Sequence, residues 1–105
     1  AYKKAIEINP NDAQSFYNLG VLYSDINKNE ESEKSYKRAL EIRPNYGNAL
    51  NNLGLLYSNL KRYEESDEAF RKAIQINPKD VLYLVNYSLL LKETGDHIKS
   101  LQFLS

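Results

Sequence analysis

The chain has 105 residues, of which 42% are hydrophobic and 27% are charged, a balance typical of a folded domain rather than a disordered segment. Its 14 Lys and Arg residues balance 14 Asp and Glu residues, which argues against nucleic-acid binding, because nucleic-acid-binding surfaces carry a basic excess. The absence of Cys excludes disulfides, thiol nucleophiles and Cys-based metal sites, and no apolar run is long enough to span a membrane.

A fixed period runs through the sequence. The three prolines are equally spaced, at Pro10, Pro44 and Pro78. Residues 13–46 align with 47–80 without a gap and share twelve identities, and internal repetition at such a period is the signature of a repeat architecture. We therefore divide the chain into the second helix of a truncated preceding copy, two complete copies and an incomplete third: residues 1–12, 13–46, 47–80 and 81–105.

Each complete copy reads as two helices separated by a polar turn, because its apolar residues recur at helical spacing. The sequence predicts helices over residues 13–27, 30–43, 47–61, 64–77 and 81–94, and no strand. Turns are expected near Lys28, Tyr46, Arg62, Lys79 and Gly95. Suitable N-cap residues are Asn29, Asn45, Asp80 and Asp96.

The second helix of each complete copy carries acidic residues first and basic residues last, the order that the helix dipole favours. Acid-before-base pairs four residues apart occur at Glu30/Lys34, Glu33/Lys37, Asp67/Arg71 and Glu68/Lys72. We interpret these charges as a solvated outer face and not as a binding surface.

The repeated residues resemble the tetratricopeptide signature. In the first complete copy they are Phe16, Leu19, Gly20, Tyr23, Ser32, Tyr36, Ala39 and Pro44, and in the second Leu50, Leu53, Gly54, Tyr57, Ser66, Phe70, Ala73 and Pro78. The third copy fits less well, because Ser88 replaces the glycine and Leu91 the tyrosine. The resemblance implies an all-α fold, a right-handed α-solenoid of antiparallel helix pairs, and a scaffold that binds proteins. Small residues at Gly20 and Ser32 should let the two helices of a pair approach closely.

A second stripe on each first helix lies opposite the apolar stripe. The resemblance implies that this stripe lines the concave groove of the superhelix and binds a peptide or a partner segment. The twelve groove positions are Gln14, Asn18, Val21, Asp25, Asn48, Asn52, Leu55, Asn59, Leu82, Asn86, Leu89 and Glu93.

One asparagine recurs among the groove positions of every copy, at Asn18, Asn52 and Asn86. A carboxamide offers both a donor and an acceptor, so it can pair with the backbone of an extended peptide. The row resembles the asparagine ladder in the repeat region of intracellular O-linked sugar transferases. The alternative is that these amides solvate the groove or bond to a neighbouring helix. The aliphatic neighbours Val21, Leu55 and Leu89 either pack between repeats or form an apolar shelf.

Other functions fit the sequence poorly. The basic clamp with which some tetratricopeptide domains hold the acidic C-terminus of a chaperone would need Lys or Arg at Tyr17, Leu82 and Asn86. His97 is the only histidine and has no partner nucleophile, so we expect no catalytic residue, no metal site and no cofactor.

We therefore expect a protein or peptide partner, with no nucleic acid and no membrane, and an intracellular location in the cytoplasm or nucleus. The alternative is a structural, substrate-recruiting or self-assembly segment of a larger protein, such as an O-linked sugar transferase. Apolar residues near the end of the sequence should leave surface uncovered and favour end-to-end self-association. They are Ile98, Leu101, Phe103 and Leu104.

Overall fold

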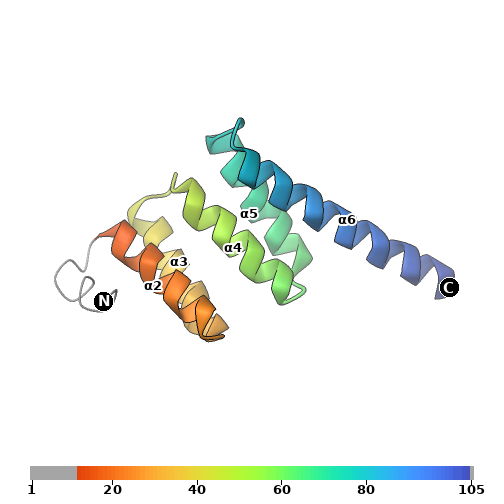
Figure 1. Cartoon of the computed structure of the whole chain (residues 1–105), viewed down its shortest axis with the longest axis horizontal. Helices are drawn as coiled ribbons and strands as arrows, with labels where there is room; N and C mark the ends of the chain where they lie inside the picture. The colour runs from red at the N-terminus through yellow and green to blue at the C-terminus, as the bar shows by residue number, and fades with distance from the viewer. Residues whose placement is uncertain (1–11, 105) are drawn as a thin grey trace.

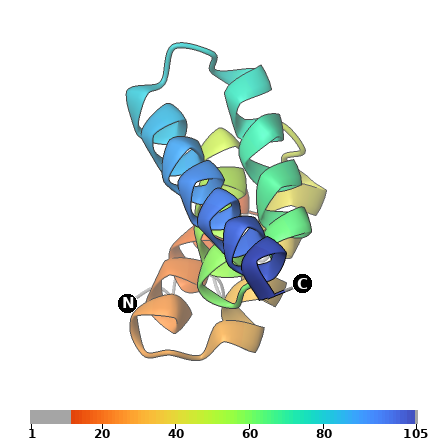
Figure 2. The same cartoon turned by 90° about the vertical axis from the view of Figure 1, so that its right-hand side faces the viewer.

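The computed structural model describes the backbone of residues 12–104 and the side chains of residues 12–95. Its five helices are α2 (Ala13–Asp25), α3 (Asn29–Ile42), α4 (Gly47–Asn59), α5 (Tyr63–Ile76) and α6 (Val81–Leu104), and the described backbone contains no strand. The helices α2, α4 and α6 lie side by side in one layer, with α3 and α5 behind them (Figures 1 and 2). The predicted helix over residues 1–12 falls almost wholly outside the described residues.

The all-α solenoid of antiparallel helix pairs predicted from the period is confirmed. Both ends of the first four helices fall within two residues of the predicted bounds. The turns near Lys28 and Arg62 close the two hairpins, and those near Tyr46 and Lys79 connect each hairpin to the next first helix.

The turn predicted near Gly95 is wrong, because α6 continues through this residue to Leu104. In the two complete hairpins the matching residues, Asn27 and Lys61, lie in the turn just after the first helix with φ of 61° and 62°, whereas no glycine has a positive φ. A turn gives up helical hydrogen bonds, and packing of the returning helix must offset that loss. The third copy has Ser88 where the complete hairpins have a glycine, so its packing is the weaker and the helix continues.

The capping predictions are partly confirmed. Asp80 accepts a hydrogen bond from the backbone N–H of Tyr83 at 3.2 Å, as expected of an N-cap. The prediction is wrong for the two asparagines and for Asp96. The residues before α3 and α4 are Lys28 and Tyr46, neither of which makes a side-chain cap, and Asp96 lies inside α6. Asp12, which the sequence analysis missed, caps α2 by accepting from the N–H of Gln14 at 3.0 Å.

The predicted close approach of the two helices in each hairpin is confirmed. The Ser32 hydroxyl donates to the carbonyl oxygen of Gly20 at 2.7 Å, and Ser66 donates to Gly54 at the same distance. The next turn of the second helix places an aromatic ring, that of Tyr36 or Phe70, directly over the glycine. The apolar stripe of the first helices is buried most completely in α4, where both neighbouring hairpins cover it. On α4 this stripe consists of Leu50, Leu53 and Tyr57.

No described helix is both long enough and apolar enough to cross a membrane.

Candidate functional site

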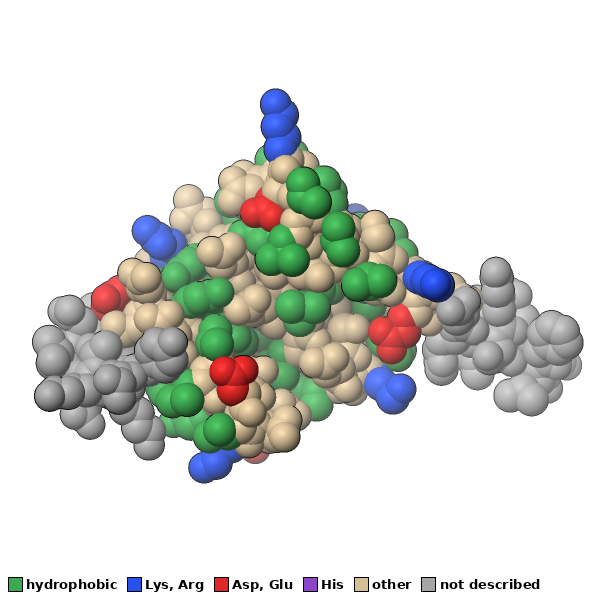
Figure 3. Space-filling view, in the orientation of Figure 1, with side chains coloured by type: hydrophobic (Ala, Val, Ile, Leu, Met, Phe, Trp, Pro, Cys, Tyr) green, Lys and Arg blue, Asp and Glu red, His purple; other side chains and the backbone are tan. Residues whose placement is uncertain are grey.

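The groove positions lie along the layer formed by α2, α4 and α6, and none of them is buried. Exposed side chains are those of Gln14, Asp25, Asn48, Leu55, Asn59, Leu82, Leu89 and Glu93. Half-buried side chains are those of Asn18, Val21, Asn52 and Asn86. Figure 3 views this face: hydrophobic side chains gather across its middle, and charged side chains are few.

Two asparagines of the predicted row make hydrogen bonds to the preceding hairpin. The Asn52 amide nitrogen donates to the hydroxyl oxygens of Tyr17, at 3.1 Å, and Tyr36, at 3.4 Å. The Asn86 amide nitrogen donates to the side-chain oxygen of Asn51 at 3.1 Å. The amide of Asn18 makes no hydrogen bond with the described residues. Asn52 and Asn86 therefore each direct an N–H donor toward the hairpin that precedes them in the sequence.

A regular spacing underlies these contacts. Hydrogen bonds join residues 35 apart at Tyr17/Asn52, Asn48/Tyr83, Asn51/Asn86 and Ser58/Glu93. Successive first helices therefore meet one residue out of step with the sequence period. Asn51 lies in the middle of this series, 2% exposed, and the sequence analysis did not select it. The only available signal was its place directly beside Asn52 on the same helix.

Apolar side chains are most exposed on the third of these helices. Leu82 and Leu89 are each 59% exposed, and Val85 is also exposed. By contrast, Val21 packs against the core cluster between the first two hairpins, so it contributes to packing between repeats. An apolar anchor of a ligand would therefore find its largest contact area on α6.

The two carboxylates at the end of the groove positions differ in their surroundings. Asp25 is exposed at the end of α2. Glu93 accepts hydrogen bonds from Tyr63 at 3.0 Å and from Ser58 at 3.3 Å, which tie α6 to the preceding hairpin. The Tyr63 hydroxyl is easier to keep protonated beside this negative charge, so its pKa is raised. Both carboxylates leave a negative charge at this edge.

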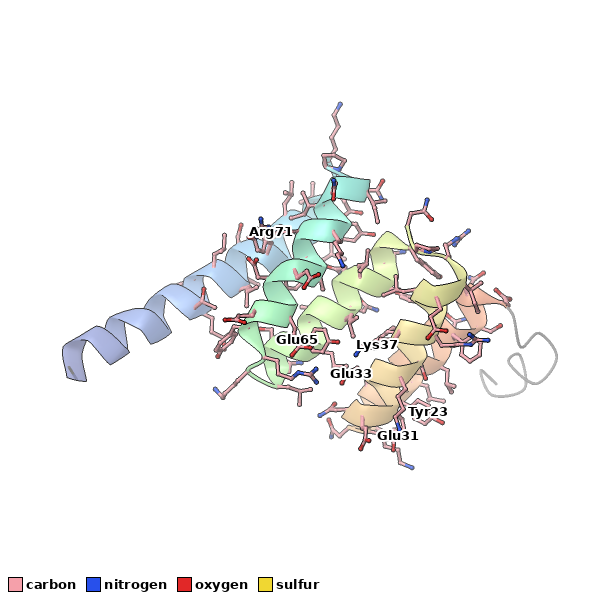
Figure 4. All side chains as sticks on the ribbon, turned by 180° about the vertical axis from the view of Figure 1, so that it is seen from behind. Tyr23, Glu31, Glu33, Lys37, Glu65 and Arg71 are labelled. Carbon is pink, nitrogen blue, oxygen red and sulfur yellow. The ribbon has the colours of Figure 1, made fainter. Side chains whose placement is uncertain are left out.

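The four predicted acid–base pairs are all formed. They lie on α3 and α5, the helices that face the viewer in Figure 4, on the opposite side of the molecule from the groove positions. Their nitrogen–oxygen distances are 3.6 Å for Glu30/Lys34, 2.9 Å for Glu33/Lys37, 3.2 Å for Asp67/Arg71 and 3.0 Å for Glu68/Lys72. Most of these side chains are more than half exposed, as expected of a solvated face.

Glu33 and Asp67 are the exceptions, at 16% and 33% exposed. Asp67 accepts from the Tyr87 hydroxyl of α6 at 2.6 Å, and Glu33 joins the two complete hairpins. Its carboxylate pairs with the Arg62 guanidinium through two bonds, of 2.9 and 3.1 Å, and accepts from the Tyr57 hydroxyl at 2.9 Å. The hydrogen bonds to Arg62, Lys37 and Tyr57 outweigh partial burial and lower the pKa of Glu33 to about 2. Arg62 also pairs with Glu65 at 2.6 Å. This cluster was not predicted, since its members come from two copies.

A shallow depression of about 290 Å³ lies between α3, α4 and α5, with Leu40, Leu50 and Leu53 in its lining. Its rim carries Lys37 and Lys72, which pair with Glu33 and Glu68, so neither cation is available to an anionic ligand. No group of acidic or histidine side chains within residues 12–95 could hold a metal ion.

Family comparisons agree with the repeat geometry. Models described as tetratricopeptide repeat match residues 1–34 and 47–80, and one described as TPR repeat matches residues 23–61. Together these matches run from residue 1 to residue 80. The chain contains tetratricopeptide repeats. A comparison with curated proteins gives no significant match.

Solved structures place this tetratricopeptide-repeat chain among known solenoids. YrrB, described as a TPR protein with an unusual peptide-binding site, is 27% identical with a TM-score of 0.84, covering 90% of this chain and 49% of its own. The Sgt2 TPR domain from Aspergillus fumigatus is 20% identical with a TM-score of 0.86, and the match covers 93% of this chain and 66% of that one. The Arabidopsis OM64 TPR domain is 24% identical with a TM-score of 0.82, and the match covers 88% of this chain and 76% of that one. The chain thus spans about half the length of YrrB.

Proposed function

We propose that the tetratricopeptide repeats of this chain bind an extended peptide across the groove positions, with Asn18, Asn52 and Asn86 contacting its backbone. The observation that carries the proposal is that all twelve groove positions keep exposed surface, whereas the opposite stripe of α4 is buried. A row of amides on three adjacent helices suits a repeating backbone better than a single side chain. The family is a protein-interaction scaffold, which agrees with this use.

The hydrogen bonds within the row define what each amide can offer a ligand. Asn18 has a free donor and acceptor with respect to the described residues, and Asn86 keeps its side-chain oxygen and one N–H. Asn52 has committed its nitrogen to two tyrosines and offers mainly its oxygen, on which Asn51 makes only a long contact of 3.5 Å. Each ligand hydrogen bond contributes about 0.5–1.5 kcal/mol, so binding would be weak and tolerant of sequence.

Specificity would come from the flanks. The negative charges of Asp25 and Glu93 favour a basic segment, and the exposed Leu82, Val85 and Leu89 favour an aliphatic anchor at α6. Three neighbouring helix axes span about 20 Å at the usual packing distance, which an extended chain of about eight residues covers.

The test uses unstructured synthetic peptides of about that length, with a central Leu and either Lys or Glu at both ends. Fluorescence anisotropy should show tighter binding of the Lys peptide, and the triple variant Asn18→Ala, Asn52→Ala, Asn86→Ala should lose it. A matched variant, Asn45→Ala with Gln75→Ala, removes exposed amides outside the groove positions and should bind normally. Equal binding by the triple variant and the unmodified chain, both folded, would refute the proposed role of the asparagines.

A second candidate is a structural role for the same row, in a spacer or substrate-recruiting segment of a larger protein such as an O-linked sugar transferase. The bonds from Asn52 to Tyr17 and from Asn86 to Asn51 favour it, since they join successive hairpins. Under this reading the triple variant loses stability without any change in peptide binding. Urea unfolding of the same variants therefore separates the two candidates.

A further inference from the structure

The last helix of the structure lacks the cover that the preceding first helix has. On α4, Gly54 lies beneath the Phe70 ring of α5, and Tyr57 is 4% exposed. The positions one period later are Ser88 and Leu91, both exposed, and Leu91 is 51% exposed. Among the described residues, one face of α6 therefore has the register of a hairpin face without a second helix against it.

A groove marks the uncovered place. A depression of about 290 Å³ lies between α5 and α6. Leu90 and Leu91 contribute its apolar part, and Glu64 and Asp67 of α5 lie along its edge. Asp67 already pairs with Arg71 and with the Tyr87 hydroxyl, so Glu64 is the carboxylate left to favour a basic residue beside the apolar stripe of an occupying helix.

The chain itself contains a segment with that pattern, at residues 97–104. Ser100 holds the register position of Ser32 and Ser66, the two serines that bond to the facing helix, and Leu104 holds that of Tyr36 and Phe70.

The charges of this segment also match the groove. Lys99 lies one repeat period after Glu65, and Asp67 lies one repeat period after Glu33. Lys99 and Asp67 are therefore the equivalents of Glu65 and Glu33 in the next copy. In the preceding interface Arg62 bridges these two acids, Glu33 and Glu65. A lysine at position 99 would approach the Asp67 carboxylate, which already pairs with Arg71 at 3.2 Å and accepts from the Tyr87 hydroxyl at 2.6 Å.

The straight course of α6 prevents this segment from reaching its own groove. Residues 96–104 continue the helix away from the rest of the fold (Figure 1). A second copy of the chain offers the same segment and the same groove. Two α6 helices crossing antiparallel near Gly95 would place each segment on the other copy's groove, a contact that is identical on both sides and therefore closes as a dimer. Gly95 has open space where a Cβ would stand, which suits a close crossing.

We propose that two copies of this chain exchange residues 97–104, each segment occupying the groove between α5 and α6 of the other copy. The exchanged contact reproduces the Gly54/Ser66 contact as Ser88 against Ser100. It uses a face distinct from the groove positions of the proposed function, and the two proposals can fail independently.

Cysteine cross-linking tests the exchange, since the natural chain has no Cys. Purified Ser88→Cys and Ser100→Cys chains, mixed and mildly oxidised, should give a disulfide-linked heterodimer on a non-reducing gel. The control mixture of Leu82→Cys with Ser100→Cys presents a thiol on the other face of α6 and should stay largely unlinked. A Ser88→Cys, Ser100→Cys double variant that closes its disulfide within one chain would show instead that the segment folds back on its own α6, and would overturn the proposal.

Analytical ultracentrifugation provides a second readout. The unmodified chain should show a concentration-dependent dimer, which Leu91→Glu should weaken at least tenfold. Leu89→Glu, the same change at an exposed leucine two residues away on the other face, should leave the dimer intact. Both variants change exposed residues, so circular dichroism should show both folded. A chain that stays monomeric at all concentrations, or equal weakening by both variants, would refute the exchange.

Discussion

Replacing Gly54 by alanine should destabilise the solenoid although alanine is the better helix former. A Cβ at this position would stand 2.8 Å from the nearest carbon of the Phe70 ring and 2.9 Å from the next. The ring is fully buried, so it cannot move into solvent. Either the ring must leave its preferred rotamer or α4 and α5 must separate, which would also stretch the 2.7 Å bond between Ser66 and the Gly54 carbonyl.

Two opposing terms decide the size of the effect. Alanine gains about 1 kcal/mol over glycine in a helix interior. Overpacking a core by one methyl group costs about 1–3 kcal/mol. The difference is a net loss of up to about 2 kcal/mol, and each kcal/mol lowers the melting temperature by about 4–8 °C in a domain near this size. Gly54→Leu adds more atoms to the same contact and should lose considerably more.

Gly95→Ala is the matched control, because no described atom beyond its own stretch of helix lies within 4 Å of the place its Cβ would take. This variant should keep or raise the stability measured by urea unfolding at one fixed, low protein concentration. Combining Gly54→Ala with Phe70→Leu should cost less than the sum of the single changes, with a coupling of about 0.5–3 kcal/mol. If Gly54→Ala raised stability as much as Gly95→Ala, the close contact between α4 and α5 would not be at Gly54.

Three further outcomes follow from the contacts between and within hairpins. Glu33→Gln should cost about 1–2 kcal/mol at neutral pH, because it weakens the pairing with Arg62. In the folded chain the pKa of Glu33 is lowered to about 2, so its contribution to the free energy of unfolding is complete above about pH 4.5 and disappears as the pH falls toward 2. In urea unfolding, Glu33→Gln should therefore lose less stability than the unmodified chain over this pH range. Ser66→Ala should cost about 1 kcal/mol by removing the buried bond to Gly54, measured by thermal unfolding. Asn51→Ala should cost about 1–3 kcal/mol, since it removes the buried acceptor of the Asn86 amide, and hydrogen exchange should quicken in α6.

The hairpin architecture was predictable because its causes are local and repeated. Glycine at positions 20 and 54 and serine at 32 and 66 recur with the period, and each pair makes the same contact within one copy. The acid–base pairs four residues apart were also predictable, since both partners lie on one helix. Such features depend only on spacing along the chain.

The turn at Gly95 could not be decided in the same way. Glycine suits the left-handed backbone that Asn27 and Lys61 adopt, so the local signal favours a turn. The choice between turn and helix depends on how well the returning helix packs, and the sequence pairs Ser88 with Leu104 where the complete hairpins pair glycine with an aromatic ring. A difference in packing over the whole interface outweighs the preference of one residue.

The contacts between hairpins show why the groove chemistry was harder to predict than the fold. Successive first helices meet with an offset of 35 residues, one more than the period, so a row of residues identical in sequence, Asn18, Asn52 and Asn86, meets non-identical neighbours. Asn52 meets Tyr17, Asn86 meets Asn51, and Asn18 meets no described residue, although all three occupy the same place in the repeat. The sequence period thus determines where each asparagine lies on its helix. The residue 35 positions earlier, on the preceding first helix, determines how many of the donors and acceptors of that amide remain available to a ligand.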